Sequence, residues 1–124
     1  MKEFTILVSD RNGNVREYLR RELAAEGYRV RLAKSGQEVL KWIYYKEPID
    51  LVILDPELPD ADEIPLLERI NDRVPTLPVI VHAFSPDYSN RPDILRAVKF
   101  VEKRGSSIEH LKEVVFELLT GINS

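Results

Sequence analysis

The chain has 124 residues, of which 44% are hydrophobic and 31% charged, so it holds enough apolar material for one core and is too short for two. Its 18 basic and 21 acidic residues give a formal net charge of −3 without long runs, which argues against a polybasic surface for nucleic acid or membranes. The absence of cysteine excludes disulfides, thiolate metal sites and cysteine nucleophiles. No apolar stretch approaches the roughly 20 residues of a membrane helix. We therefore expect one cytoplasmic domain over residues 1–124.

Five short strands are predicted along the chain. The apolar runs at residues 4–8 and 51–54 are too brief for helices, and polar turn formers follow both. Residues 78–81 form a third run of this kind. Residues 28–32 alternate strictly between polar and apolar, which is typical of a strand near a sheet edge, and residues 98–101 form another modest strand.

Helical patterns alternate with these strands. The first opens at Asn14, with Glu17 three residues later, and closes at Gly27. The second begins with the capping box that joins Ser35 to Glu38 and ends before Pro48. Apolar spacing predicts three further helices, over residues 62–73, over residues 92–97, and from a cap at residue 106 or 107 to residue 121.

This order of elements predicts an α/β fold of the (βα)5 type, a three-layer sandwich with helices on both faces of a parallel five-stranded sheet. In such sheets the functional crevice lies beyond the carboxyl ends of the strands. Asp10 follows the first strand, Asp55 the third and Lys103 the fifth. Two carboxylates and an ammonium group from distant parts of the chain are therefore expected at one edge.

These residues resemble those of a response-regulator receiver domain. The resemblance rests on Ile6-Leu-Val-Ser-Asp10, on the run from Asp50 to Asp55 followed by Pro-Glu-Leu-Pro-Asp60, and on Phe100-Val-Glu-Lys103. It covers essentially the whole chain and implies a flavodoxin-like fold with strand order 2-1-3-4-5.

The resemblance also implies residue roles. Asp55 would be the phosphoacceptor, Asp10 a member of the acidic metal pocket, and Lys103 the lysine that pairs with the phosphoryl group. The metal site would comprise Asp10, Asp55 and the backbone carbonyl of Glu57. Phe100 would hold the aromatic switch position.

The implied reaction is phosphoryl transfer from a phosphohistidine to Asp55, with Mg²⁺ and a lysine neutralising the phosphoryl oxygens. The implied partners are a histidine kinase or phosphotransfer protein, and an effector or output domain that binds near the fourth and fifth strands. Direct contact with nucleic acid or membrane is not expected, and a homodimer stays open. The protein would not be an enzyme, beyond slow hydrolysis of its own acyl phosphate.

Arg11 is the first departure from the family pattern, which has a second acidic residue there as a metal ligand. Asp10 and Asp55 are balanced by Arg11 and Lys103, which removes the electrostatic reason for Mg²⁺. We hypothesise that the Arg11 guanidinium pairs with Asp55 and partly replaces the ion. Glu57 and Asn12 offer oxygen ligands that would favour Mg²⁺. The sequence leaves Mg²⁺ binding open.

The second departure follows the fourth strand, where the family has a Ser or Thr that hydrogen-bonds the phosphoryl group. Counting from Pro78 places Ala83 there, whereas matching the next two residues to relatives places His82 there. Neither supplies a hydroxyl group, and Ser85 would replace it only after a loop shift. Conventional coupling to Phe100 is therefore in question.

Two other functions compete with the phosphoacceptor. A pseudo-receiver would use the same fold as a phosphorylation-independent interaction module. A flavin or nucleotide binder is disfavoured because the segment after the first strand, Asp10-Arg-Asn-Gly-Asn14, contains one glycine and a repelling acid instead of a glycine-rich phosphate loop.

Overall fold

The computed structural model describes residues 3–45, 47–60, 64–72, 77–84, 99–104 and 107–121. Strands and helices alternate along the described residues as far as Ala83, and the five strands form one parallel sheet in the order β2-β1-β3-β4-β5. The predicted α/β fold and strand order are therefore confirmed. The elements are β1 (Thr5–Ser9), α1 (Gly13–Ala25), β2 (Arg29–Ala33), α2 (Gly36–Tyr45), β3 (Leu51–Leu54), α3 (Leu66–Asn71), β4 (Val79–Ala83), β5 (Lys99–Glu102) and α5 (Ser107–Thr120).

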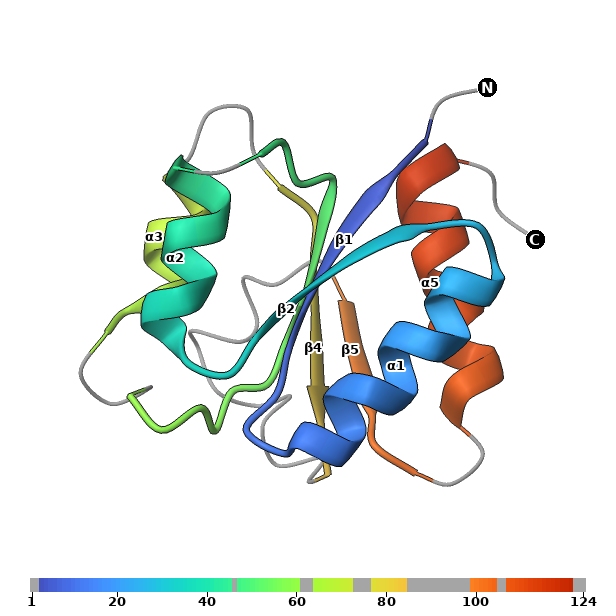
Figure 1. Ribbon diagram of the computed structural model, residues 1–124, viewed down its shortest axis with the longest axis horizontal. Helices are drawn as coiled ribbons and strands as arrows, with labels where there is room; N and C mark the ends of the chain where they lie inside the picture. Colours follow the sequence, from blue (N-terminus) through green and yellow to red (C-terminus); the bar gives the residue numbers. More distant parts are fainter. Residues whose placement is uncertain are drawn as a thin grey trace.

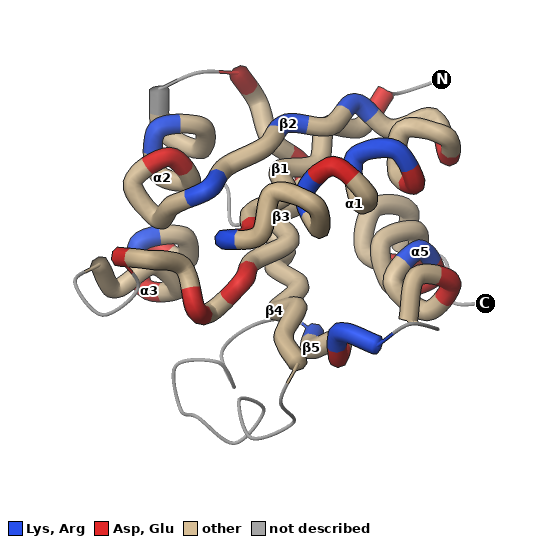
Figure 2. The backbone as a smooth tube through the Cα atoms, turned by 60° about the horizontal axis from the view of Figure 1, so that its bottom comes forward, with Lys and Arg blue, Asp and Glu red and all other residues tan. Residues whose placement is uncertain are grey.

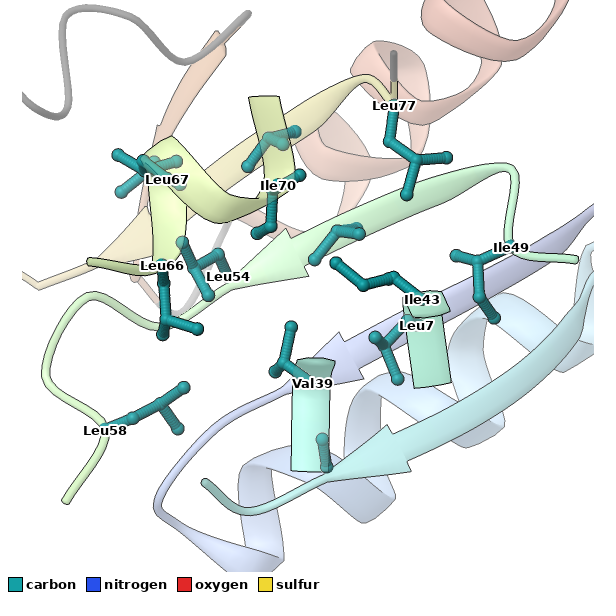
Figure 3. Packing of buried hydrophobic residues seen from close by; sticks show 14 residues of the cluster. Leu7, Val39, Ile43, Ile49, Leu54, Leu58, Leu66, Leu67, Ile70 and Leu77 are labelled. Carbon is teal, nitrogen blue, oxygen red and sulfur yellow. The ribbon is translucent and has the colours of Figure 1, made fainter. Parts of the chain in front are cut away.

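The sheet separates two apolar layers. Helices α1 and α5 lie on one side of it, and α2 and α3 lie on the other (Figure 1). Alternate residues of each strand point to opposite faces. In β1, Leu7 packs toward α2 and α3, whereas Ile6 and Val8 pack toward α1 and α5. Figure 3 shows the first layer, where Val39 and Ile43 of α2 approach side chains from the sheet and α3.

Strand β2 lies at the edge of the sheet and pairs with β1. Its burial pattern runs from exposed Arg29 to buried Ala33. The prediction of an edge strand from the alternation at residues 28–32 is therefore confirmed. The central strands β1, β3 and β4 are buried along their whole length, which agrees with their continuous apolar runs.

The predicted start of α1 is wrong by two residues. Asn12, not Asn14, is the N-cap, and its Oδ1 accepts a hydrogen bond of 2.8 Å from the Asn14 backbone N–H. The predicted capping box of α2 is confirmed for the hydrogen bond to the serine side chain, because the Glu38 N–H donates to Ser35 Oγ at 3.2 Å. Glu38 Oε1 reaches back to the Lys34 N–H at 2.8 Å. Both caps pair backbone donors that a helix leaves unpaired.

Helix α3 begins later than the predicted residue 62. Ile64 and Pro65 precede the first helical residue, Leu66. A proline disfavours helical backbone angles at the residue before it, which excludes Ile64 from the helix. Strands β4 and β5 end two residues and one residue later than predicted. Residues 61–63, 73 and 98, and the whole predicted helix at 92–97, lie outside the described residues.

No helix within the described ranges is long and apolar enough to span a bilayer.

Candidate functional site

Asp10, Asp55 and Lys103 meet at the carboxyl edge of the sheet, as predicted. Lys103 Nζ lies 2.6 Å from Asp10 Oδ2 and 3.8 Å from Asp55 Oδ2. Asp10 and Asp55 are each 1% exposed and Lys103 is 8% exposed. Figure 2 brings this edge forward and shows acidic and basic segments around it. Three ionisable groups far apart in the chain therefore form one buried cluster.

Strand pairing places the two carboxylates side by side. The register of β1 and β3 aligns Val8 with Ile53, so the residues that follow both strands are neighbours. Ser9 joins the strand ends, because its hydroxyl group donates to the Ile53 carbonyl at 2.9 Å and accepts from the Asp55 N–H at 3.3 Å. Asp55 consequently leaves the sheet at a fixed position beside Asp10.

Lys103 reaches the cluster from β5. Its backbone N–H donates to the Ala83 carbonyl at 2.6 Å, which extends the β4–β5 pairing beyond Glu102. The ring of Phe84 lies beside the ammonium, with its centroid 5.2 Å from Nζ, although the Phe84 residue is 63% exposed. The ammonium group thus contacts two carboxylates and an aromatic face.

Backbone donors hold both carboxylates. Asp55 Oδ1 accepts from the Glu57 N–H at 2.9 Å, and Asp55 Oδ2 accepts from the Arg11 N–H at 3.1 Å. Asp10 Oδ1 accepts from the Asn12 N–H at 2.9 Å. These three hydrogen bonds from backbone amides fix the orientation of both buried carboxylates.

Arg11 bridges the loops that follow β1 and β3. Its Nη2 lies 2.5 Å from Glu57 Oε2, and its Nε lies 3.9 Å from Asp55 Oδ2. The hypothesis that the Arg11 guanidinium pairs with Asp55 is confirmed, at 3.9 Å. Glu57 is nevertheless the closer partner of Arg11, at 2.5 Å. Although burial lowers the pKa of Arg11, the carboxylates of Glu57 and Asp55 raise it above its ordinary value. Arg11 therefore remains a permanent cation beside Asp55.

The arrangement does not fit a divalent metal ion. Across the described parts of the chain, no three His, Cys, Asp or Glu side chains are grouped to hold one. Asp10 and Asp55 face the Lys103 ammonium, while the Glu57 side chain faces Arg11. Asn12 Oδ1, the other oxygen considered, caps α1. The side-chain oxygens that Mg²⁺ would use thus already lie against protein donors or cations, including Asp10 Oδ2, which lies 2.6 Å from the Lys103 ammonium.

The end of β4 contains His82 and Ala83, the two candidates for the position where the family has a Ser or Thr. Ala83 is the last residue of β4 and, by alternation, shares a face with Val79 and Val81. Phe100 pairs in register with Val81 and packs against the α2–α3 layer. Ala83 therefore lies on the same face of the sheet as Phe100. Ser85 lies outside the described residues.

His82 points to the opposite face, toward α1 and α5. It lines a cavity of about 370 Å³ together with Lys103, Phe84 and residues of those two helices. Burial and, secondarily, the Lys103 ammonium lower the pKa of His82 to about 4, although the Asp55 carboxylate opposes this. His82 is therefore a neutral, buried imidazole at neutral pH.

Sequence reasoning missed two residues that shape the site. Ser9 fixes Asp55, and its position directly before Asp10 was a usable signal. Arg16, one turn into α1, donates from Nη1 to the Asp10 carbonyl at 2.6 Å. Nothing in the sequence marks Arg16, because most arginines on a helix surface point to solvent.

Comparison with known proteins places this geometry in a family. Residues 6–115 match the response regulator receiver domain. The chain is 37% identical to the response regulator MprA of Mycolicibacterium vanbaalenii over 86 residues, which cover 69% of this chain and 37% of MprA. It is 33% identical to the DNA-binding transcriptional regulator NtrC of Escherichia coli K12, over 91% of this chain and 26% of NtrC. The chain thus spans little more than a third of the length of MprA and about a quarter of the length of NtrC.

Solved structures agree with this assignment. The response regulator TrrA of Thermotoga maritima in complex with Mg²⁺-BeF is 33% identical, with a TM-score of 0.85, over 94% of this chain and 99% of TrrA. TrrA in a complex with the histidine kinase ThkA is 36% identical, with a TM-score of 0.81 and the same coverage. The fold and site therefore define a two-component signalling module. The chain belongs to the response regulator receiver domain family.

Proposed function

We propose that residues 1–124 form a single receiver domain that accepts a phosphoryl group on Asp55. The observation that carries this proposal is the buried cluster in which Lys103 lies between Asp10 and Asp55. A carboxylate held by backbone donors and flanked by a cation is oriented for attack on phosphorus, and the same cation then balances the added negative charge. The domain is a signalling module and not an enzyme that acts on a separate substrate.

The phosphodonor in this proposal is the phosphohistidine of a kinase or phosphotransfer protein. A carboxylate oxygen of Asp55 forms the new bond to phosphorus, while the P–N bond breaks and its electron pair returns to the imidazole nitrogen. The similarity to TrrA, which was solved in a complex with a histidine kinase, supports this donor class. We propose that this domain meets its phosphodonor in the cytoplasm.

The downstream partner is an effector or output domain that binds near β4 and β5. Phe100 holds the position of the aromatic switch in this proposal, since it packs against the α2–α3 layer from β5. Ala83 holds the usual Ser or Thr position, on the same face of the sheet. Because alanine has no hydroxyl group, position 83 cannot donate a side-chain hydrogen bond to the phosphoryl group. The response to phosphorylation therefore depends on electrostatic interactions within the cluster of Asp10, Asp55 and Lys103.

A second candidate function is a pseudo-receiver, and one observation favours it. Asp55 is almost completely buried, and a phosphodonor reaches it only after neighbouring groups move. If they do not move, the domain acts as a phosphorylation-independent interaction module.

Incubation with phosphoramidate, a small donor with a P–N bond, separates the two functions. Intact-mass spectrometry of the wild type should show one added phosphoryl group. The Asp55→Asn variant should show none, while Asp72→Asn, an exposed aspartate after α3, should match the wild type. Equal masses with and without donor, in wild type as in Asp55→Asn, would favour the pseudo-receiver.

A further inference from the structure

We propose that Arg11, in place of a divalent metal ion, is the counter-cation of the phosphoryl group; this inference rests on the proposed function. In the unphosphorylated protein Glu57 pairs with Arg11, and phosphorylation of Asp55 shifts Arg11 from Glu57 to the phosphoryl group. The side chains around Asp55 do not fit a metal ion, so some other positive charge must balance the phosphoryl oxygens. Lys103 supplies one such charge. Arg11 is the other cation in contact with Asp55 among the described residues.

The contacts of Arg11 place its charge at the reacting carboxylate. Its backbone N–H donates to Asp55 Oδ2, and its Nε lies 3.9 Å from the same atom. Lys103 Nζ approaches that oxygen at 3.8 Å. Oδ2 is therefore the point where two cationic side chains from the ends of β1 and β5 converge.

Charge balance supports the same role. The buried carboxylates of Asp10 and Asp55 are matched by Lys103 and Arg11, and the carboxylate of Glu57 adds one negative charge. An acyl phosphate carries one more negative charge than the carboxylate it replaces, and its three phosphoryl oxygens suit the planar fork of a guanidinium group. Phosphorylation thus makes Asp55 a stronger partner for Arg11 than Glu57.

Arg11 is able to leave Glu57 for another anionic partner. Its side chains are 45% and 38% exposed, so water screens the pair and its net stabilisation is small. Asp55, in contrast, is buried, and a guanidinium that turns toward it enters a less polar environment where attraction is stronger. Glu57 therefore competes with the phosphoryl group for Arg11 and stabilises the unphosphorylated state.

The step needs no further reactant. With acetyl phosphate as donor, an Asp55 oxygen bonds to phosphorus, the bond from phosphorus to the acetate oxygen breaks, and acetate leaves with the electron pair. Arg11 gains and loses no proton in this step, because its role is electrostatic.

Phosphorylation by acetyl phosphate, followed by intact mass with EDTA and with Mg²⁺, tests the proposal. The wild-type rate should agree within about twofold between the two conditions. Arg11→Asp should be about ten- to a hundredfold slower in EDTA, as expected for loss of a charged hydrogen bond, and Mg²⁺ should restore much of the rate. Glu57→Gln should accelerate the reaction in EDTA.

The control variant is Arg20→Asp, which makes the same change in charge as Arg11→Asp at an exposed position on α1. It should behave as wild type.

Calorimetric titration with Mg²⁺ gives a second readout that does not depend on phosphorylation. Wild type should show no saturable binding, and Arg11→Asp should show binding at one site. Saturable binding of equal affinity in both proteins would overturn the proposal, as would a wild-type reaction that stops in EDTA. If no protein is phosphorylated in any condition, the proposed function fails, and the titration alone then decides whether Arg11 occupies the place of the metal.

Discussion

Lys103 Nζ lies 2.6 Å from Asp10 Oδ2, and both side chains are almost completely buried. The contact joins the ends of β1 and β5, which are separated by β3 and β4 in the sheet. A buried ion pair of this kind has a small net effect on stability, but the loss of one partner leaves the other charge buried and uncompensated. The pair therefore makes the site sensitive to single substitutions.

Lys103→Met should lower the free energy of unfolding by about 3–5 kcal/mol, because the carboxylates of Asp10 and Asp55 lose their shared ammonium. Urea unfolding followed by circular dichroism measures this change. The double variant Asp10→Asn/Lys103→Met should recover part of the loss, since it removes one of the stranded charges. A loss below about 1 kcal/mol would contradict the burial and pairing described for Lys103.

His82 should make stability depend on pH between about 4 and 6.5. Its folded pKa of about 4 lies below the 6.5 of an ordinary histidine, so in this range the unfolded chain binds the proton and the folded one does not. Its contribution is complete above pH 6.5 and is lost as pH falls toward 4, by about 3 kcal/mol in total.

Unfolding free energies measured at several pH values check this dependence. His82→Met should lose less stability between pH 7 and pH 4 than the wild type does. His110→Gln, at an exposed position on α5, should follow the wild-type curve. Parallel curves for wild type and His82→Met would show that His82 is not buried as a neutral imidazole.

Ser9→Ala should destabilise the domain by about 1–3 kcal/mol, because the Asp55 N–H and the Ile53 carbonyl lose their shared hydroxyl partner at a buried position. The substitution should also slow phosphorylation of Asp55, whose position depends on this contact. Thermal unfolding and intact-mass kinetics measure the two effects. An unchanged melting temperature would contradict the role given to Ser9.

Asp60→Ala should destabilise the start of α2 by about 1 kcal/mol. Asp60 Oδ1 accepts from the Gly36 N–H at 2.6 Å, and Oδ2 accepts from the Gln37 N–H at 3.0 Å. Asp60→Asn retains one acceptor and should lose less. Urea unfolding of the two variants should therefore rank Ala below Asn, and the reverse order would exclude a capping role.

The sequence allowed the fold and the central cluster to be predicted because both depend on patterns that extend over whole elements. Apolar runs gave the strands, and the shared edge of parallel strands then brought Asp10, Asp55 and Lys103 together. Local choices between similar residues were not predictable. Asn12 and Asn14 are equally good caps, and backbone geometry alone selects Asn12.

The partner of Arg11 was only partly predictable for a related reason. Charge counting showed that a cation stands where an acid is usual, but Asp55 and Glu57 lie two residues apart in one loop. The direction of the long arginine side chain decides between them, and sequence does not encode that direction. Ser9 and Arg16 both act through contacts with backbone atoms; the position of Ser9 directly before Asp10 marks it in the sequence, but nothing marks Arg16.

Chemical mapping of the modified residue tests the central claim most directly. After treatment with a small phosphodonor, reduction by borohydride converts an aspartyl phosphate to homoserine, which peptide mass spectrometry locates. We predict homoserine at position 55 in the wild type and at no position in Asp55→Asn. Homoserine at another aspartate, with Asp55 unmodified, would contradict the assignment of the cluster formed by Asp10, Asp55 and Lys103 as the phosphorylation site.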